Sequence, residues 1–299
     1  HDVGGYFDFS SDDEAVQVRT ELMHALNSMG LEIEVGHHEV ARGQHEIVFR
    51  FADALRTADN VMTFKYAVKA IAAQHGLIAS FMPKPIFGIN GSGMHTHMSL
   101  FDTKGDTVFF DKDDEFNLSK TAYSFLAGQL KHARALSALV APSVNSYKRL
   151  VPGYEAPVYV CWAQMNRSAL VRIPRYTAGQ EKATRIELRC PDPSCNPYLA
   201  FAGMLAAGKD GMDNELEPPK SLNNVNIYKL SEEELKAKGI KALPSSLADA
   251  LAELDKDSLL KDALGEDIYS AFRRAKLEEN EDYRIHVTDW EVEKYLESA

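Results

Sequence analysis

Residues 34–46 read Glu-Val-Gly-His-His-Glu-Val-Ala-Arg-Gly-Gln-His-Glu and concentrate carboxylates and imidazoles in a short span. The residues that lead into them, 31–35, alternate apolar and polar side chains as a half-buried strand does. A polar turn at 42–44 follows, and residues 46–51 then read as the returning strand. The pattern therefore predicts two strands that turn back on each other around the His-His-Glu segment.

Glu39 and Glu46 lie on either side of this turn, seven positions apart. On facing strands their carboxylates would aim at one point, as two ligands of a Mg²⁺ or Mn²⁺ site. Such ions in turn suit phosphates, so the pattern favours an enzyme that handles a nucleotide. The alternative is a solvated polar face. The neighbouring His37, His38 and His45 favour a site, although imidazoles beside carboxylates also form simple pairs.

A second polar segment, residues 90–99, reads Asn-Gly-Ser-Gly-Met-His-Thr-His-Met-Ser and predicts a glycine turn before a strand over 95–101. Side chains on a strand point alternately to its two faces. One face would carry His95, His97 and Ser99, and the other Thr96, Met98 and Leu100. This is the pattern of a strand that lines a cleft, or of a strand with one wet side. The turn has neither a P-loop ending nor dinucleotide-fingerprint spacing.

Basic residues gather in one part of an acidic chain. Residues 148–189 hold eight basic and three acidic residues, a local charge of +5, whereas the whole chain carries −11. The basic residues are Lys148, Arg149, Arg167, Arg172, Arg175, Lys182, Arg185 and Arg189, and the acidic ones are Glu155, Glu181 and Glu187. The planar guanidinium suits carboxylate and phosphate. The cluster therefore predicts a pocket for an anionic substrate and nucleotide phosphates, or else a salt-bridged surface ladder.

On the strand expected over 184–189, Arg185, Glu187 and Arg189 face one way. In the functional interpretation, Glu187 completes a metal site beside the two arginines.

The remaining pattern predicts an α+β fold with antiparallel strands rather than a doubly wound parallel sheet, because strands turn back through short loops. Further strands are expected over 158–165 and 169–173, and residues 214–243 form a polar excursion. Helices are expected over 11–29 (with a capping box at Ser11 and Glu14), 54–74, 119–140, 197–209 and from 247 to the end.

Composition narrows the class of protein. The 299 residues are 45% hydrophobic and 26% charged, enough for one large domain or two ordinary ones. A charge of −11 argues against a general nucleic-acid surface. No apolar run reaches the roughly 18 residues of a membrane span, and the N-terminal residues do not resemble an export signal. Cys161, Cys190 and Cys195 read as reduced thiols, so a cytoplasmic location is expected.

Five segments closely resemble the catalytic domain of type I glutamine synthetase, the bacterial and archaeal class, and they occur in the family's order. The likeness runs from Gly4 to the C-terminus. The segments are His-His-Glu-Val-Ala with Gly-Gln-His-Glu (37–46), Lys-Pro with Asn-Gly-Ser-Gly-Met-His-Thr-His (84–97), Lys-Arg-Leu-Val-Pro-Gly-Tyr-Glu-Ala-Pro (148–157), Asn-Arg-Ser-Ala (166–169) and Arg-Ile-Glu-Leu-Arg-Cys-Pro-Asp-Pro-Ser-Cys-Asn-Pro-Tyr (185–198).

The resemblance implies ATP-dependent ligation of ammonia to L-glutamate, giving L-glutamine through γ-glutamyl phosphate. It implies two or more Mg²⁺ or Mn²⁺ ions per site, with ATP as co-substrate. Such chemistry needs metals and arginines because charge on the transferring phosphoryl group has to be offset. The implied fold is a curved antiparallel sheet flanked by helices, the glutamine synthetase/guanido kinase-like catalytic domain.

The family's motifs also imply roles for individual residues. Glu39 and Glu46 would hold one metal ion, and His95 and Glu187 the second. Glutamate would be bound by Asn90, Gly91, Arg149, Glu155, Arg167 and Arg189. ATP would be bound by Glu34, His97, Met98, Ser99, Arg167, Arg172, Lys182 and Arg185. The catalytic set would be Arg149, Arg167, which would sit against the transferring phosphoryl group, and Glu155, a flap carboxylate that would help remove a proton from ammonium.

Family members also carry a small N-terminal β-grasp domain and a catalytic-domain strand with a Glu-x-Glu pair. The likeness here begins beyond both. Each metal site is therefore expected to lack one carboxylate, and the ammonium site to lack an aspartate given by a neighbouring subunit. We expect residues 1–299 to be one catalytic domain that is incomplete by itself.

Two further expectations concern regulation and assembly. Tyr228 stands at about the position that is adenylylated in part of the family, but residues 226–234 resemble the shorter branch, which typically is not. Full-length relatives form two stacked six-membered rings, so a homo-oligomer is expected. The C-terminal helix, residues 290–296, would reach into the opposite ring or, alternatively, pack on its own chain.

Two alternatives to glutamine synthesis remain. One is ligation of glutamate to another amine, as in a γ-glutamylpolyamine synthetase, although Arg149, Glu155 and Arg167 together favour ammonia. The other is a non-catalytic paralogue that assembles or binds nucleotide without turnover. Every family position within the chain nevertheless carries the expected residue type.

Overall fold

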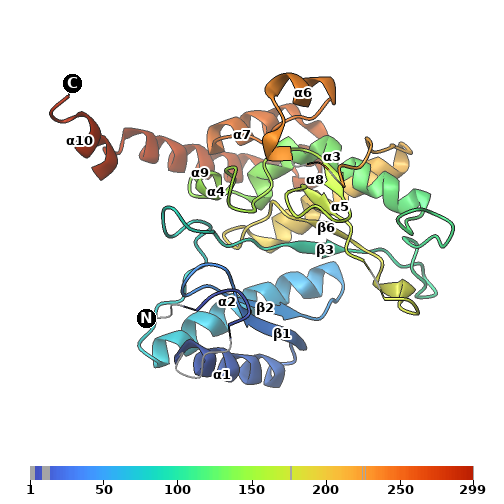
Figure 1. Cartoon of the computed structure of the whole chain (residues 1–299), viewed down its shortest axis with the longest axis horizontal. Helices are drawn as coiled ribbons and strands as arrows, with labels where there is room; N and C mark the ends of the chain where they lie inside the picture. Colours follow the sequence, from blue (N-terminus) through green and yellow to red (C-terminus); the bar gives the residue numbers. More distant parts are fainter. Residues whose placement is uncertain (1–3, 9–13, 176, 224, 226, 299) are drawn as a thin grey trace.

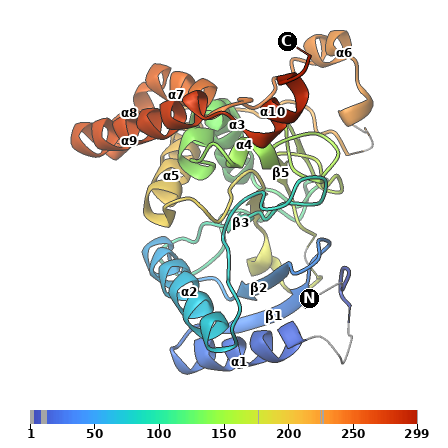
Figure 2. The ribbon, with the colours of Figure 1, turned by 90° about the vertical axis from the view of Figure 1, so that its left-hand side faces the viewer.

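The computed structural model describes residues 4–8, 14–175, 177–223, 225 and 227–298. Two helices and a hairpin form a small N-terminal unit, and the later elements form a larger body beside it (Figure 1). A view from the side shows the same division, with the hairpin facing the larger body across a boundary that β3 follows (Figure 2). The predicted metal ligands Glu39, Glu46, His95 and Glu187 lie on or next to β1, β2, β3 and β6 along this boundary.

The N-terminal unit packs two helices against the predicted hairpin. Its elements are α1 (Glu14–Ser28), β1 (Ile33–His38), β2 (His45–Phe49) and α2 (Ala54–Gln74). Leu22 and Leu26 of α1 are buried with Leu31 and Ala67, and this cluster holds the unit together. The bounds of α2 match the prediction because Asp53 caps its first turn and its pattern ends before Gly76. The cap expected at Ser11 lies outside the described residues.

The hairpin is antiparallel, and His37 is paired with Glu46 and His38 with His45. Gly43 adopts a φ of +66° at the turn, where residues other than glycine are strained. The Glu39 amide donates to the Gln44 carbonyl at 2.7 Å and closes the loop.

The larger body contains a four-stranded sheet in the order β3-β6-β5-β4. Its short strands are β3 (Thr96–Met98), β4 (Trp162–Ala163), β5 (Val171–Arg172) and β6 (Ile186–Leu188). β6 is antiparallel to β3 on one side and to β5 on the other. The α+β class is confirmed.

The prediction of a purely antiparallel sheet is wrong at one edge, because β4 and β5 run parallel. The connection between them is held outside the sheet. Asn223 accepts from the Gln164 amide at 2.6 Å, and the Asn166 side chain donates to the Val225 carbonyl at 2.9 Å. The connection allows β5 to run in the same direction as β4. The residues that anchor it, Asn223 and Val225, lie about sixty positions further along the chain.

Helices cover the sheet on the side away from the hairpin unit (Figures 1 and 2). The first two are α3 (Lys120–Val140) and α5 (Pro197–Asp213). These helices approach closely because glycines line the contact. A Cβ on Gly128 would lie 2.0 Å from the Ala207 carbonyl oxygen, and one on Gly211 would lie 2.0 Å from that of Ser124. Phe125 and Leu136 of α3 and Met204 of α5 are fully buried in the same core.

The expected C-terminal helical region is divided into four helices, α7 (Leu247–Lys256), α8 (Ser258–Leu264), α9 (Glu266–Ile285) and α10 (Asp289–Tyr295). Caps at Asp257 and Thr288 and the left-handed Gly265 break the run. The polar excursion contains α6 (Glu232–Ala237), which packs Leu235 into a separate small cluster. Short turns α4 (Ser146–Arg149), η1 (Glu181–Ala183) and η2 (Ile227–Lys229) complete the fold.

Helix α10 leaves the body at its far end (Figure 1). Its apolar side chains are exposed, 61% for Trp290 and 77% for the following Leu296. Self-packing of this segment, one of the two alternatives, therefore does not occur in the described chain. Among the helices in the described ranges, none combines the length and apolar character needed to cross a membrane.

His132 ties three helices of the body together. Its Nδ1 lies 2.6 Å from Asp257 Oδ2 and its Nε2 lies 3.1 Å from Asp210 Oδ2, while only 8% of the side chain is exposed. Burial alone lowers the pKa of this imidazole, but the hydrogen bonds to the two carboxylates outweigh it and raise the pKa above the ordinary 6.5. The imidazole is thus protonated more readily in the folded chain than an ordinary histidine.

We expect His132→Ala to lower the free energy of unfolding by about 2 kcal/mol at pH 6, because two carboxylates lose a buried partner. A raised folded-state pKa stabilises fully below the unfolded value of 6.5 and loses its effect as the pH rises through the folded value. The loss should therefore shrink at pH 9. Urea titrations at both pH values test this, with the exposed His24→Ala as control. An equal loss at both pH values would contradict the assignment.

Candidate functional site

The hairpin brings three potential metal ligands together on one face. His37 Nε2 lies 3.0 Å from Glu39 Oε1 and 3.7 Å from Glu46 Oε2. One ligand atom from each of the three residues falls within 4.8 Å of the other two. The convergence of Glu39 and Glu46 follows from the register, because Glu46 faces His37 and Glu39 follows directly after β1.

The surroundings of the Glu46 carboxyl disfavour its charged form, which a nearby cation would stabilise. Burial, a hydrogen bond with Glu39 and the charges of Glu39 and Glu187 raise its pKa to about 7, while Arg189 acts in the opposite direction. A divalent ion between the carboxylates would relieve this repulsion. The donor set of two carboxylates and one imidazole fits Mn²⁺ or Mg²⁺. His37 was noted in the sequence only as a neighbour, yet it completes the group.

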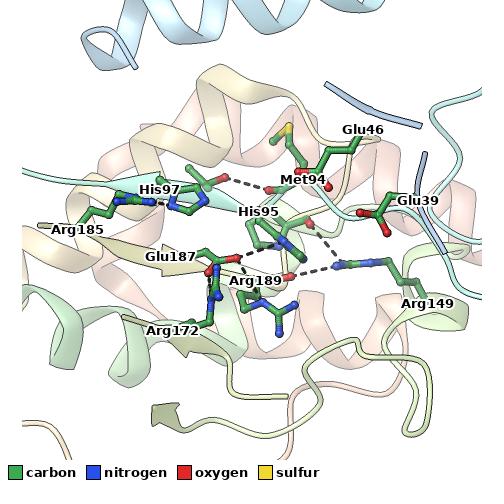
Figure 3. Close-up of polar contacts among 12 residues, drawn as sticks. Glu39, Glu46, Met94, His95, His97, Arg149, Arg172, Arg185, Glu187 and Arg189 are labelled. Atoms are coloured by element: carbon green, nitrogen blue, oxygen red, sulfur yellow. Dashed lines mark hydrogen bonds and ion pairs between the residues drawn. The ribbon is translucent and has the colours of Figure 1, made fainter. Parts of the chain in front are cut away.

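The larger body contributes a second cluster around Glu187, which lies on β6 and is only 2% exposed (Figure 3). His95 Nδ1 lies 3.3 Å from Glu187 Oε1, and Arg189 Nε lies 3.4 Å from the same oxygen. The Arg172 guanidinium, opposite Glu187 on β5, donates to Oε2. His95 and Glu187 thus approach as two ligands of one ion do, since adjacent ligands of a Mg²⁺-sized ion stand about 3 Å apart.

The alternation predicted for β3 is confirmed. His95 meets Glu187 and His97 Nδ1 accepts from Arg185 Nε at 3.0 Å, whereas Met98 and Leu100 pack on the main core. Burial, followed by the charges of Arg189 and Arg149, lowers the pKa of His95 well below 6.5. Its imidazole is therefore neutral near pH 7, which is the form that binds a metal ion.

Arg149 and Arg189 form a buried positive centre beside this cluster, with exposed fractions of 4% and 6%. Arg149 donates through Nη1 to the Cys190 carbonyl at 2.9 Å and through Nη2 to the Arg189 carbonyl at 3.0 Å. Arg189 Nη1 is buried without a hydrogen-bond partner within the described ranges. Gly91 and Gly93 pass close to Arg149, where a Cβ on Gly93 would lie 2.4 Å from Nη2. An anionic group would satisfy these donors.

The residues expected to bind ATP do not all lie together in the structure. Arg185 and His97 lie together, on the opposite side of the cluster from Glu39 and Glu46 (Figure 3), and the charge of Glu34 acts on Arg185. Lys182 instead donates to the Gly105 carbonyl at 2.8 Å. The partly buried Met98 side chain packs on the core, and Ser99 follows β3 directly.

Glu155 and Arg167 lie apart from the two clusters, on the rim of a pocket of about 520 Å³. Tyr228, Asn166 and Ser168 also line it. Glu155 has a φ of +59°, which is uncommon for a residue other than glycine. Its charge still acts on Arg189, so the pocket and the buried arginines are electrostatically linked.

Two polar residues for which the sequence predicted no role, Gln44 and Lys84, contact the Asn90–Gly91 loop from other parts of the chain. Gln44, in the hairpin turn, donates to the Gly91 carbonyl at 2.9 Å and to Ser92 Oγ at 3.1 Å. Lys84 donates to the Ile89 carbonyl. Both support the Asn90–Gly91 loop from elsewhere in the chain. A glutamine in a turn or a lysine before a proline carries no local signal of such a role.

Comparison with known proteins gives a consistent result. The family model described as "Glutamine synthetase, catalytic domain" matches residues 1–295. Curated proteins named glutamine synthetase are 54% identical in Halobacterium salinarum and 53% identical in Methanocaldococcus jannaschii and Thermus thermophilus. Each alignment covers 99% of this chain but only 64% or 65% of the relative, so the chain spans slightly less than two thirds of these proteins' length.

Solved structures agree with the sequence comparison. A GmaS complex with ADP superposes with a TM-score of 0.88 at 38% identity, covering 97% of this chain and 66% of that one. The Plasmodium falciparum glutamine synthetase gives a TM-score of 0.87 at 29% identity, covering 98% and 64%.

We expect Glu46→Gln to weaken Mn²⁺ binding at pH 8 by more than about tenfold, because a charged ligand is lost. The unaltered site should bind Mn²⁺ about tenfold less tightly at pH 6 than at pH 8, since a carboxyl with a pKa of about 7 is protonated at the lower pH. The variant should lose this pH dependence. Calorimetric titration with MnCl₂ measures both effects.

The matched control is Glu32→Gln, an exposed hairpin glutamate paired with Arg50. If the two variants bind Mn²⁺ alike, the hairpin carboxylates are not the ligands.

Proposed function

Because the chain belongs to the glutamine synthetase family, we propose that it catalyses ATP-dependent ligation of ammonia to L-glutamate through γ-glutamyl phosphate. The observation that carries the proposal is that a pair of carboxylates on the hairpin faces a cluster of arginines in the larger body. Acidic Glu39 and Glu46 face a buried group of arginines across the boundary between the hairpin unit and the larger body. An anionic substrate and divalent cations complement this arrangement.

The glutamate site is proposed at Arg189, Arg149 and the Asn90–Gly91 loop. The buried Nη1 of Arg189, with no partner among described residues, supports this because an unmatched buried guanidinium N–H is costly without an anion. Arg149 keeps further N–H groups beyond those that its carbonyl partners occupy. A carboxylate that is bound there would lie next to the metal ligands.

Phosphoryl transfer is proposed to occur between Glu187 and the hairpin carboxylates. Bound Mg²⁺ or Mn²⁺ would supply positive charge to the ATP phosphates and to the transferring group. Glu39 and Glu46 would hold one ion, while His95 and Glu187 would hold the other. Arg172 pairs with Glu187 and orients its carboxylate, and Arg185 with His97 offers donors at the nucleotide end. Glu34, Met98, Ser99 and Lys182 are assigned to ATP on the resemblance.

Glu155 and Arg167 are proposed to act at the second step. Arg167 would face the phosphoryl group, and the Glu155 carboxylate would take a proton from ammonium so that ammonia can attack. Their shared pocket with Asn166 and Tyr228 supports a common site. A homo-oligomer, in the form of two stacked six-membered rings, is proposed for the whole protein, and the exposed apolar side chains of α10 support a contact there.

The deciding experiment is glutamate-dependent phosphate release from ATP with MgCl₂, comparing ammonium with methylamine, ethylamine and putrescine. Release with ammonium alone supports glutamine synthesis. Preference for another amine would establish the amine-ligase alternative. ATP binding without turnover, under conditions that retain Mn²⁺ binding, would instead indicate a non-catalytic paralogue.

We further expect Arg189→Lys to raise the KM for glutamate by about 10- to 100-fold, because lysine cannot reproduce the planar fork that pairs with a carboxylate. The KM for ATP should change less than about threefold. Steady-state kinetics with each substrate varied in turn provides the test, and the exposed Arg50→Lys is the control. An equal rise in both KM values would argue against a glutamate-specific role.

A further inference from the structure

The turn that carries Glu155 has a strained backbone. Gly153 has a φ of +95° and Glu155 a φ of +59°, so two left-handed residues stand two positions apart, with Tyr154 between them. Glutamate rarely adopts this conformation, and surrounding contacts have to hold it there. The Glu155 side chain itself is exposed at the pocket rim. The contacts that position it therefore fall on its two neighbours, Tyr154 and Ala156.

Lys84 holds the residue before Glu155. Its Nζ lies 3.7 Å from the centre of the Tyr154 ring, within the range of a cation–π contact. The same ammonium donates to the Ile89 carbonyl, next to the Asn90–Gly91 loop. Lys84 is only 8% exposed, and Asn145 fixes its backbone through hydrogen bonds of 2.7 Å and 3.1 Å. One buried lysine thus joins the loop and the turn.

Tyr228 holds the residue after Glu155. Its hydroxyl donates to the Ala156 carbonyl at 2.7 Å, and its ring lines the pocket that Glu155 and Arg167 share. Ala156 is buried, with 3% exposed, so this anchor is fixed on the protein side. One contact holds the Tyr154 side chain before Glu155, the other holds the Ala156 carbonyl after it, and the Glu155 side chain lines the pocket.

We propose that Lys84 and Tyr228 are positioning residues that hold Glu155 in its left-handed conformation from both sides. Lys84 also transmits the state of the Asn90–Gly91 loop to the turn, since it contacts both. The inference rests on the proposed function, in which Glu155 takes the proton from ammonium. The ammonia nitrogen then bonds to the carbonyl carbon of the γ-glutamyl phosphate, and phosphate leaves with the electron pair of the broken C–O bond and takes up the proton that the nitrogen loses on becoming an amide.

Hydroxylamine separates positioning of Glu155 from general damage to the site. Ammonium has to give up a proton before it attacks, whereas hydroxylamine is largely unprotonated at neutral pH. A displaced Glu155 should therefore slow the reaction of ammonium much more than that of hydroxylamine. The ratio of the two rates is also independent of how much of a variant is folded.

The experiment measures kcat/KM for ammonium and for hydroxylamine in the protein at its natural full length. The variants are Tyr228→Phe, Lys84→Met and the conservative Lys84→Arg. Tyr228→Phe and Lys84→Met should lower kcat/KM for ammonium by about tenfold and that for hydroxylamine by less than about threefold. Lys84→Arg should recover part of the loss, because arginine also stacks on aromatic rings.

A matched pair of control residues lies in the helical body. Lys261 donates to the Asp255 carbonyl at 2.9 Å and stands over the Tyr269 ring, and the Tyr269 hydroxyl donates to Asp255 at 2.7 Å. Lys261→Met and Tyr269→Phe remove the same kinds of contact away from the site. They should leave the ammonium-to-hydroxylamine ratio unchanged.

The outcomes distinguish this inference from the function on which it rests. If the unaltered protein shows no glutamate-dependent turnover, the proposed function fails. If it is active and Glu155→Ala shifts the ratio while Tyr228→Phe and Lys84→Met do not, the function stands and the positioning role is wrong. Equal losses with both amines in the two variants would also overturn it.

Discussion

A carboxylate buried in the sheet, that of Glu187, sets the constraint on which the candidate site depends. At 2% exposure it would be strongly destabilising without compensation, and an unpaired buried charge is rarely tolerated. Arg172 from β5 and Arg189 after β6 supply the compensating charge, and His95 from the approach to β3 completes the group. The register of three strands is therefore tied to one side chain.

The charges do not balance locally, and this imbalance is what makes the boundary chemically useful. Beside Glu187 the larger body places two guanidinium groups, those of Arg172 and Arg189, against one carboxylate. The hairpin brings the Glu39 and Glu46 carboxylates together, and the pKa of Glu46 is raised to about 7. The hairpin side therefore carries an excess of negative charge, and the side of the larger body carries an excess of positive charge. Metal ions relieve the acidic half, and carboxylate or phosphate groups relieve the basic half.

The rest of the molecule makes this arrangement rigid on one side and adjustable on the other. Helices α3 and α5 pack closely behind the sheet because glycines line their contact. The strands that carry Glu187 and Arg172 therefore rest on a dense core. The Glu155 turn and the Asn90–Gly91 loop lie in irregular segments of the chain. Polar contacts from Gln44, Lys84 and Tyr228 help to hold them. Contacts of this kind can be remade when a substrate arrives.

The sequence by itself determined the features that local patterns encode. A glycine stop at Gly76 and a proline stop at Pro142 located the ends of α2 and α3, alternation assigned the faces of β3 and β6, and the spacing of Glu39 and Glu46 across a turn predicted their convergence. Long motifs identified the family. Each of these signals lies within a few residues of what it describes.

Only the tertiary structure decided the parallel pairing of β4 and β5, the partners of Glu187, and the roles of His37, Gln44, Lys84 and Tyr228. These features join residues that are far apart in the chain. Asn223 anchors the loop after β4, and Lys84 reaches Tyr154 across seventy positions. The local sequence around a residue does not indicate its distant partner, because burial and charge pairing arise only when the packed core brings the segments together.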